Sequence, residues 1–166
     1  MESRTFSNHY HEDALVSSSP EKVFAYLDDH MNLSSHMNKS TWMMGGGRMG
    51  TTIDEGHGQK VGSHIRLSGK AFGISIALDE VVTRYEPPRF KTWETVGSLK
   101  LLVVGHYRLG VEITPHNGTS DLRVFIDYNL PDRNAWLGYL FGKAYAKWCV
   151  RQMLYGVRNY FNLRKV

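Results

Sequence analysis

Residues 133–162 read RNAWLGYLFGKAYAKWCVRQMLYGVRNYFN. The stretch contains no proline and many good helix formers, so it predicts one long C-terminal helix. At about 100° per residue, one narrow arc of this helix is basic and the opposite arc is largely aromatic. The basic arc carries Lys143, Lys147, Arg151 and Arg158, and the opposite arc carries Phe141, Tyr145, Trp148, Cys149, Gln152 and Tyr155. Gly138, Gly142 and Gly156 fall on the aromatic side, which we expect to face the rest of the protein.

Before this helix, the hydrophobic pattern has the period of two that is typical of strands. Strands are predicted at 42–44, 49–53, around 65–67, over 72–78, at 90–96, over 101–114 and over 122–130. Turn signals separate them. Glu86-Pro87-Pro88-Arg89 predicts a turn because proline has no N–H to donate to a strand ladder, and Asn117-Gly118 is a strong hairpin signal.

The N-terminal segment predicts one more strand and a helix. Residues 5–18 alternate loosely, and Ser19 followed by Pro20 is typical of an N-cap and first helical position. Val23, Phe24 and Leu27 then recur at helical spacing, and the helix is expected to end near His30 or Met31. The order of elements predicts an α+β fold in which a curved antiparallel sheet wraps around the C-terminal helix.

The inner face of that helix permits two interpretations. A glycine inside a helix costs about 1 kcal/mol relative to alanine, and facing a sheet it allows either close approach or empty room. A long helix over a curved sheet could therefore enclose an apolar cavity, or the same residues could form a packed core. The pattern alone leaves both open.

The chain resembles the START-like helix-grip superfamily (SRPBCC), most closely its polyketide cyclase/dehydrase-type members. The resemblance rests on SSPEKVFAYLDD (18–29), VGSHIRLSG (61–69), LDEVVTRYEPPRFKTWE (78–94) and the terminal helix, and it covers about residues 10–162. It implies the helix-grip fold around a hydrophobic tunnel. Relatives bind lipids, sterols, hormones, polyketides or quinones, and only some of them are catalysts.

Several side chains are expected to line such a cavity. The predicted ligand-binding residues are Trp42, Met44, Ile76, Trp93, Val103, Tyr107, Ile126, Tyr128, Phe141, Tyr145 and Trp148. Tyr107 and Tyr128 are also candidate catalytic residues, because a buried tyrosine hydroxyl can donate to a ligand carbonyl. The alternative is that each is a core tyrosine with a backbone partner. Cys149 is expected to be a small buried hydrophobe.

Other motifs favour ordinary roles. Residues 45–50, GGGRMG, match the dinucleotide fingerprint, but β-branched residues follow where a helix should begin, so a glycine-rich bend is favoured. His9 and His11 share a face without a third ligand, so no metal site and no cofactor are expected. Arg48 could clamp an acidic ligand but is expected at the surface. Asp54, Glu55, Asp79 and Glu80 are interpreted as solvated charges near strand ends.

Charge is concentrated at the C-terminal end. Residues 133–166 hold seven Lys and Arg and no Asp or Glu, so this segment is +7 and the remaining chain is −3, since the total is +4. The basic arc is either a solvated outer face or a contact for anionic lipid. Nucleic acid is not an expected partner, because the aromatic residues face away from the basic ones.

Length and composition predict one domain spanning residues 1–166, and a lone cysteine with no apolar leader favours the cytoplasm. The first functional hypothesis is binding of a small hydrophobic molecule (a lipid, polyketide or isoprenoid-like compound) in an internal cavity. The alternatives are a polyketide cyclase/dehydratase-type enzyme and, third, a lipid or quinone chaperone at membrane surfaces. The sequence leaves open whether the protein is an enzyme, and its oligomeric state.

Overall fold

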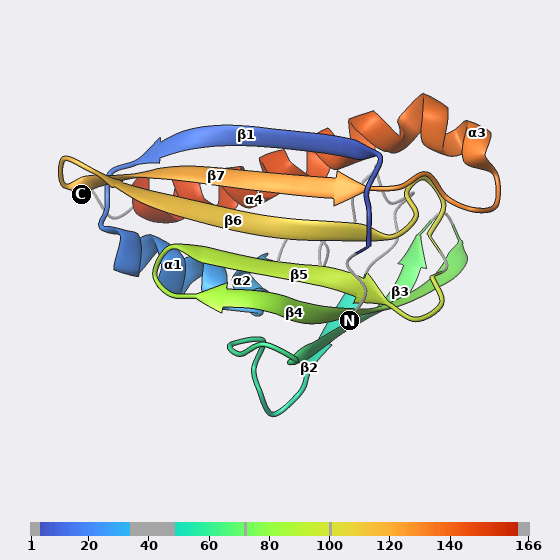
Figure 1. Ribbon diagram of the computed structural model, residues 1–166, viewed down its shortest axis with the longest axis horizontal. Helices are drawn as coiled ribbons and strands as arrows, with labels where there is room; N and C mark the ends of the chain where they lie inside the picture. The colour runs from blue at the N-terminus through green and yellow to red at the C-terminus, as the bar shows by residue number, and fades with distance from the viewer. Residues whose placement is uncertain (1–3, 34–48, 72, 100, 163–166) are drawn as a thin grey trace.

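A seven-stranded antiparallel sheet and a long C-terminal helix dominate the computed structural model, which describes residues 4–33, 49–71, 73–99 and 101–162 (Figure 1). The strand order is β1-β7-β6-β5-β4-β3-β2. The strands are β1 (Asn8–Val16), β2 (Met49–Ile53), β3 (His64–Ala71), β4 (Ile74–Glu86), β5 (Phe90–Val96), β6 (Tyr107–His116) and β7 (Thr119–Tyr128). The predicted α+β helix-grip arrangement is therefore confirmed.

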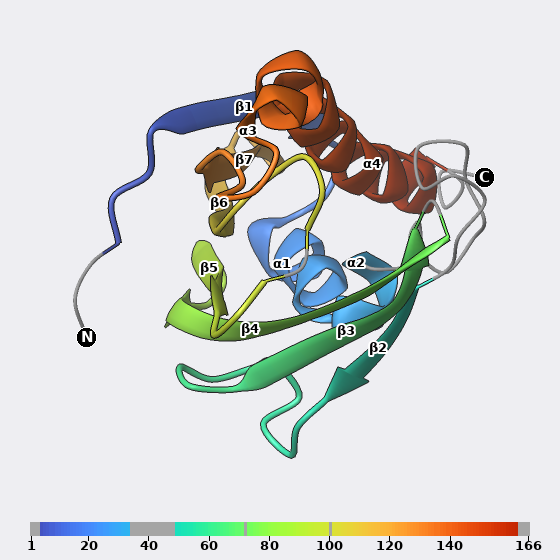
Figure 2. The same cartoon turned by 90° about the vertical axis from the view of Figure 1, so that its right-hand side faces the viewer.

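The helices lie on the concave side of this sheet. They are α1 (Pro20–Asp28), α2 (His30–Leu33), α3 (Ala135–Leu137), a π-helical turn (Gly138–Gly142) and α4 (Lys143–Asn162). Figure 2 shows β2, β3 and β4 sweeping beneath α1 and α2, while α4 crosses on the other side. Helix α4 packs mainly on β1 and β7 and also contacts α1 and α2. The sheet and α4 thus bound the interior from opposite sides.

Local signals place most of these elements. Ser19 is the N-cap of α1 with Pro20 in the first turn, as predicted, although the helix ends at Asp28 and the separate α2 follows. Asn117 and Gly118 both have positive φ, at 46° and 81°, as a tight hairpin between β6 and β7 requires. The alternating residues Leu122, Val124, Ile126 and Tyr128 of β7 are all buried.

The strand predicted to begin at Leu101 begins instead at Tyr107. Residues 101–106 cross the end of β7, where Gly105 donates a backbone hydrogen bond to Asn129 O at 2.8 Å. A Cβ at Gly105 would lie 2.5 Å from the Leu130 carbonyl oxygen, so only glycine permits this crossing. The contact of Gly105 with residues 129–130 therefore sets the start of β6 at Tyr107, although the hydrophobic alternation in the sequence begins at Leu101.

The predicted inner face of the C-terminal helix is partly wrong. The residues that α4 buries are Ala146, Cys149, Val150, Met153, Leu154 and Val157. Phe141 is 51% exposed and Tyr155 is also exposed, so neither faces the sheet. The π turn is one physical reason for Phe141, because an extra residue in a turn rotates the residues before it relative to those after it. Tyr155 lies within α4 itself and is simply not on the face that this helix buries. Gly138 and Gly142 do lie on the inner side, and both are buried.

Candidate functional site

A row of four side chains with polar groups crosses the inner face of the sheet. Glu80 of β4 pairs with Thr95 of β5, and Tyr107 of β6 pairs with Tyr128 of β7. Thr95 joins the two pairs, because its hydroxyl Oγ1 accepts a hydrogen bond from the Tyr107 backbone N at 3.1 Å. All four residues are buried. Strand register therefore places a carboxyl and two phenols side by side on a surface that is otherwise apolar.

Glu80 is the unusual member of this row. It is only 4% exposed, and the Tyr107 hydroxyl donates a hydrogen bond to its Oε1. Burial raises the pKa of Glu80 to about 7; the hydrogen bond from Tyr107 opposes this shift, and the nearby Asp79 carboxylate adds to it. Near neutral pH the carboxyl therefore populates both its protonated and its ionised form, as a proton-transfer group requires.

Tyr107 remains a neutral donor over the same pH range. Burial raises its pKa well above the ordinary value, and the charge of Glu80 raises it further. Its backbone is held by Thr95, whose hydroxyl lies 3.1 Å from Tyr107 N and 3.3 Å from Tyr107 O. Tyr107 can therefore donate a hydrogen bond to Glu80 or to a ligand oxygen without losing its own proton.

Helix α4 contributes two more polar groups that interact with Glu80. Tyr145 and Cys149 lie one turn apart, and the Tyr145 hydroxyl is a hydrogen-bonding partner of the Cys149 thiol. The negative charge of ionised Glu80 interacts with both side chains and contributes to their raised pKa values. Burial raises the pKa of Cys149 to about 12, so it is a thiol at neutral pH and not a nucleophile, in agreement with the predicted role of a small buried hydrophobe.

A second polar cluster closes the end of the interior nearest α1. Lys91 of β5 is fully buried, and its Nζ lies 2.6 Å from Asp28 Oδ1 at the end of α1. Tyr85 donates to the other Asp28 oxygen at 2.8 Å. Burial lowers the pKa of Lys91, although Asp28 opposes that shift. Since each charged group in this cluster has a partner, its evident role is to anchor α1 to the sheet.

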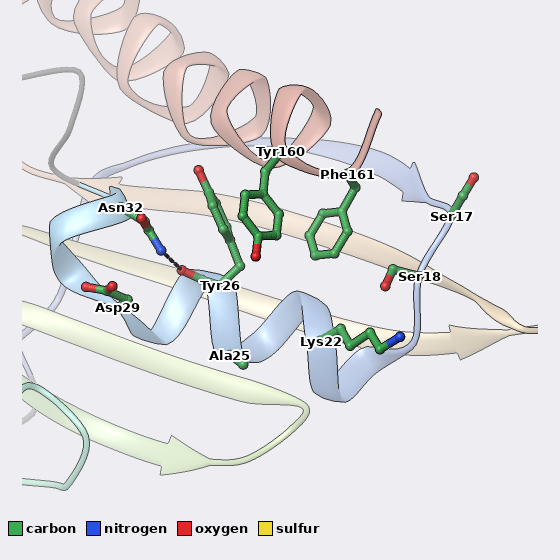
Figure 3. Close-up of a pocket in the computed structure, with 9 residues that line it drawn as sticks. All are labelled: Ser17, Ser18, Lys22, Ala25, Tyr26, Asp29, Asn32, Tyr160 and Phe161. Carbon is green, nitrogen blue, oxygen red and sulfur yellow. Dashed lines mark hydrogen bonds between the residues drawn. The ribbon is translucent and has the colours of Figure 1, made fainter. Parts of the chain in front are cut away.

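The structure also contains a cleft between α1 and the end of α4. It has a volume of about 500 Å³ and is lined by Ser17, Ser18, Lys22, Ala25, Tyr26, Asp29, Asn32, Tyr160 and Phe161. Figure 3 shows the rings of Tyr26, Tyr160 and Phe161 side by side between α1 and the end of α4. The ring centroids of Tyr26 and Tyr160 are 4.5 Å apart. This cleft lies outside the predicted site, and none of the predicted ligand-binding residues lines it.

The predicted binding residues do not all lie where they were expected. Five are buried in the core around the sheet: Ile76, Trp93, Tyr107, Ile126 and Tyr128. Three others, Val103, Tyr145 and Trp148, are partly buried and pack against that core. Phe141 is exposed, so its assignment to the cavity wall is wrong. Trp42 and Met44 lie outside the described residues, as do Arg48 and residues 45–47. The ligand-binding roles, and the cavity itself, remain predictions.

The interpretation of Glu80 as a solvated charge near a strand end is also wrong. Strand β4 runs thirteen residues, from Ile74 to Glu86, and Glu80 lies in its middle. The alternation that buries Ile76 and Leu78 continues through Glu80 to Val82. That alternation is visible in the sequence, so extending the period-two pattern by one period, from Leu78 to Glu80, would have indicated a buried carboxyl.

Comparison with known families agrees with this architecture. The family described as "Polyketide cyclase / dehydrase and lipid transport" matches residues 9–161. The chain belongs to this family. The match spans every strand and helix described above except the first residue of β1 and the last residue of α4. No curated protein matches the chain by sequence.

Solved structures of this fold are similar over nearly the whole chain. The protein TTHA0849 from Thermus thermophilus has a TM-score of 0.65 at 12% identity, covering 96% of this chain and 100% of its own. A Thalictrum norcoclaurine synthase mutant, bound to a transition-state analogue, has a TM-score of 0.67 at 12% identity and coverage of 99% and 100%. The two-domain ARO/CYC protein StfQ of the steffimycin pathway has a TM-score of 0.68 at 8% identity, covering 94% of this chain and 51% of that one. At these identities the likeness concerns the family's fold alone.

Proposed function

We propose that this protein binds a small, largely apolar molecule bearing a carbonyl or hydroxyl group between the sheet and α4, and transfers a proton to or from it. The observation that carries the proposal is the buried Glu80 carboxyl, hydrogen-bonded by Tyr107 and with its pKa raised to about 7. A carboxyl buried among apolar side chains is costly to keep, and such groups are concentrated at functional sites. The family description, which includes cyclases and dehydrases, supports this class of chemistry.

The pair is suited to a redox-neutral dehydration or ring closure of a polyketide-like substrate. Ionised Glu80 would take a proton from the carbon next to a carbonyl, while Tyr107 donates a hydrogen bond to the carbonyl oxygen as it becomes an enolate. In a dehydration, the carbon–oxygen bond of a β-hydroxyl then breaks, and Glu80 returns its proton so that water leaves. The carbon–carbon double bond forms from the electron pair that the enolate releases.

Binding would come mainly from the surrounding apolar side chains. Burial of apolar ligand surface contributes about 25 cal/mol per Å², and the polar row would fix orientation. Norcoclaurine synthase and the ARO/CYC protein are named as biosynthetic proteins, and they support placing small-molecule chemistry in this fold. The cytoplasm remains the predicted location.

The second candidate is a carrier that binds the same kind of molecule without changing it. Most buried side chains on the inner face are aliphatic, among them Leu67, Leu78 and Val124, and the family description also includes lipid transport. In a carrier, Glu80 and Tyr107 would only orient the ligand.

Hydrogen–deuterium exchange on a bound ketone separates the two candidates without knowledge of the natural substrate. The probe is 2-tetralone, a bicyclic aromatic ketone, in D₂O, with exchange of its α-protons followed by NMR and its binding followed by saturation transfer. We expect the protein to accelerate exchange, with a rate that rises as Glu80 ionises around pH 7. Glu80→Gln should lower the protein-dependent rate by roughly 10²-fold or more.

Glu112→Gln is the matched control, because Glu112 is exposed on β6 and should leave exchange unchanged. Tyr107→Phe should move the pH midpoint upward, since the Tyr107 hydrogen bond lowers the pKa of Glu80. Binding of the ketone with no acceleration, equal in wild type and Glu80→Gln, would reject the enzyme and favour the carrier. Absence of binding to 2-tetralone and to a fatty acid alike would reject both.

A further inference from the structure

Four large apolar side chains are exposed within six consecutive residues where the C-terminal helix begins. Trp136 is 61% exposed, Tyr139 79%, Leu140 64% and Phe141 51%, and we call these four residues the apolar patch. Scattered exposed apolar residues are ordinary, but a contiguous group marks an interaction surface. Figure 1 shows α3 and the following turn lying beyond the end of β7, at the extremity of the molecule.

Two glycines occupy the side of this segment that faces the protein, so the apolar patch points outward. A Cβ at Gly138 would lie 2.6 Å from Pro131 Cδ and 3.0 Å from Leu130 Cδ2, and one at Gly142 would lie 3.1 Å from the Val103 carbonyl oxygen. The side of the segment that faces the protein is therefore occupied by glycines in close contact with residues 103 and 130–131. A larger side chain cannot rotate into that space, so the patch remains in solvent unless another body covers it.

Positive charge accompanies the patch. Arg133 and Lys143 flank it and are exposed, and Lys147 follows one turn later. Residues 133–166 include no Asp or Glu, although Asp132 immediately precedes them. Further along α4 the basic arc has a partner within the protein, since Arg151 Nε lies 2.7 Å from Glu12 Oε1 of β1. Lys147 also interacts electrostatically with Glu12, so the solvated-face interpretation fits Arg151 and Lys147, while Arg133 and Lys143 beside the patch are placed to meet an external anion.

We propose that the apolar patch docks the protein on the surface of an anionic lipid bilayer. Trp, Tyr, Leu and Phe beside Lys and Arg are the composition of segments that lie in the membrane interface, with aromatic rings at headgroup level. Each basic residue near an anionic surface adds to the attraction. The contact would be peripheral, because no helix in the described part of the chain is long and apolar enough to cross a membrane.

A second copy of the chain is a less suitable occupant. In a two-fold contact the same surface lies on both sides, so two basic surfaces from a segment without Asp or Glu would face each other. A bilayer containing anionic lipid instead covers the apolar rings and neutralises the basic residues together. The inference does not depend on Glu80 or on the proposed chemistry, although delivery at a membrane would suit an apolar ligand.

Vesicle flotation tests the proposal directly. The intact chain is mixed with vesicles of phosphatidylcholine alone, or with about one third phosphatidylserine, at roughly 0.05 M and 0.5 M salt. We expect binding to the anionic vesicles at low salt, and weaker binding at high salt and to phosphatidylcholine alone. The variant Trp136→Ser/Leu140→Ser/Phe141→Ser should lose roughly tenfold or more in apparent affinity, and Lys143→Glu should lose less.

The matched control is Leu15→Ser/Tyr155→Ser, which removes two exposed apolar side chains away from the patch and should bind like wild type. Circular dichroism and thermal unfolding verify that each variant is folded. If a variant does not fold, the blue shift of Trp136 fluorescence on adding anionic vesicles to wild type, absent in Trp136→Phe, supplies the same test. The proposal would be overturned if the wild-type protein did not bind anionic vesicles, or if the patch and control variants lost vesicle affinity equally. So would a dimer abolished by the patch variant in the absence of vesicle binding.

Discussion

Glu80 is the residue that most clearly distinguishes the interior of this protein from an ordinary apolar core. Its neighbours on the inner face of β4 are Ile76, Leu78 and Val82, all buried and apolar. A neutral side chain of similar size would avoid the cost of burying a carboxylate there. A buried ionisable group that lowers stability without an evident structural gain is expected at a functional site.

That cost predicts how stability depends on pH. The pKa of Glu80 rises from an ordinary 4.5 to about 7 on folding, so the native state holds this proton more tightly than the unfolded state. The contribution of this group is complete below about pH 4.5 and is lost as pH rises through 7, by up to about 3 kcal/mol. Glu80→Gln should remove that loss, which urea unfolding of both proteins at several pH values measures. Parallel stability curves for the two proteins would contradict the assignment.

At the scale of elements, the C-terminal helix shows how glycine determines packing. Gly138 and Gly142 lie against Pro131, Leu130 and Val103, so here glycine provides close approach, the first of the two possibilities that the sequence left open. Gly156 likewise lies near Tyr26, whose hydroxyl would be 3.2 Å from an added Cβ. These contacts seat the two ends of the helix on different parts of the fold.

Gly138→Ala should therefore destabilise the protein, although alanine is the better helix former by about 1 kcal/mol. The new Cβ would lie 2.6 Å from Pro131 Cδ, and relieving that overlap should cost about 1 to 3 kcal/mol. Gly156→Ala is the control, because it meets only the far end of the Tyr26 side chain and should be near neutral. Denaturant unfolding of the three proteins compares them. A Gly138→Ala variant as stable as wild type would show that the segment does not pack as described.

At the scale of the whole molecule, the interior is closed at one end by an ion pair between distant segments. Asp28 ends α1 and Lys91 lies in β5, so their 2.6 Å contact joins elements sixty-three residues apart. Tyr85 and the ring of Phe24, 5.8 Å from the Tyr85 ring, reinforce the same junction. This junction holds α1 over the sheet.

Breaking this pair should be far more costly than breaking a surface pair. Lys91→Met leaves the Asp28 carboxylate buried without its cation and should lower the free energy of unfolding by about 3 to 5 kcal/mol. The double variant Asp28→Asn/Lys91→Met should recover part of that loss, because no buried charge remains. Asp13→Asn, which breaks the exposed Asp13–Arg123 pair, should cost less than about 1 kcal/mol. Similar losses for Lys91→Met and Asp13→Asn in urea unfolding would contradict this role.

The order of strands and helices was predictable from the sequence, because alternation, helical spacing, Ser19-Pro20 and Asn117-Gly118 act on neighbouring residues. Tyr107 and Tyr128 were also predicted on the inner face, since alternation places them with Val111 and Ile126. The burial of Glu80 was within reach of the same rule, but a charged residue was assigned to solvent by its type.

Only the tertiary structure decided how these surfaces meet. It placed Glu80 beside Tyr107 from separate strands. It also set the start of β6 at Tyr107, because Gly105 crosses residues 129–130, and it exposed Phe141 and Tyr155 to solvent. Local patterns determine which elements form, because they depend on residues close in sequence. Which face of an element is covered depends on the shape of distant segments, and that information appears only when the chain is folded.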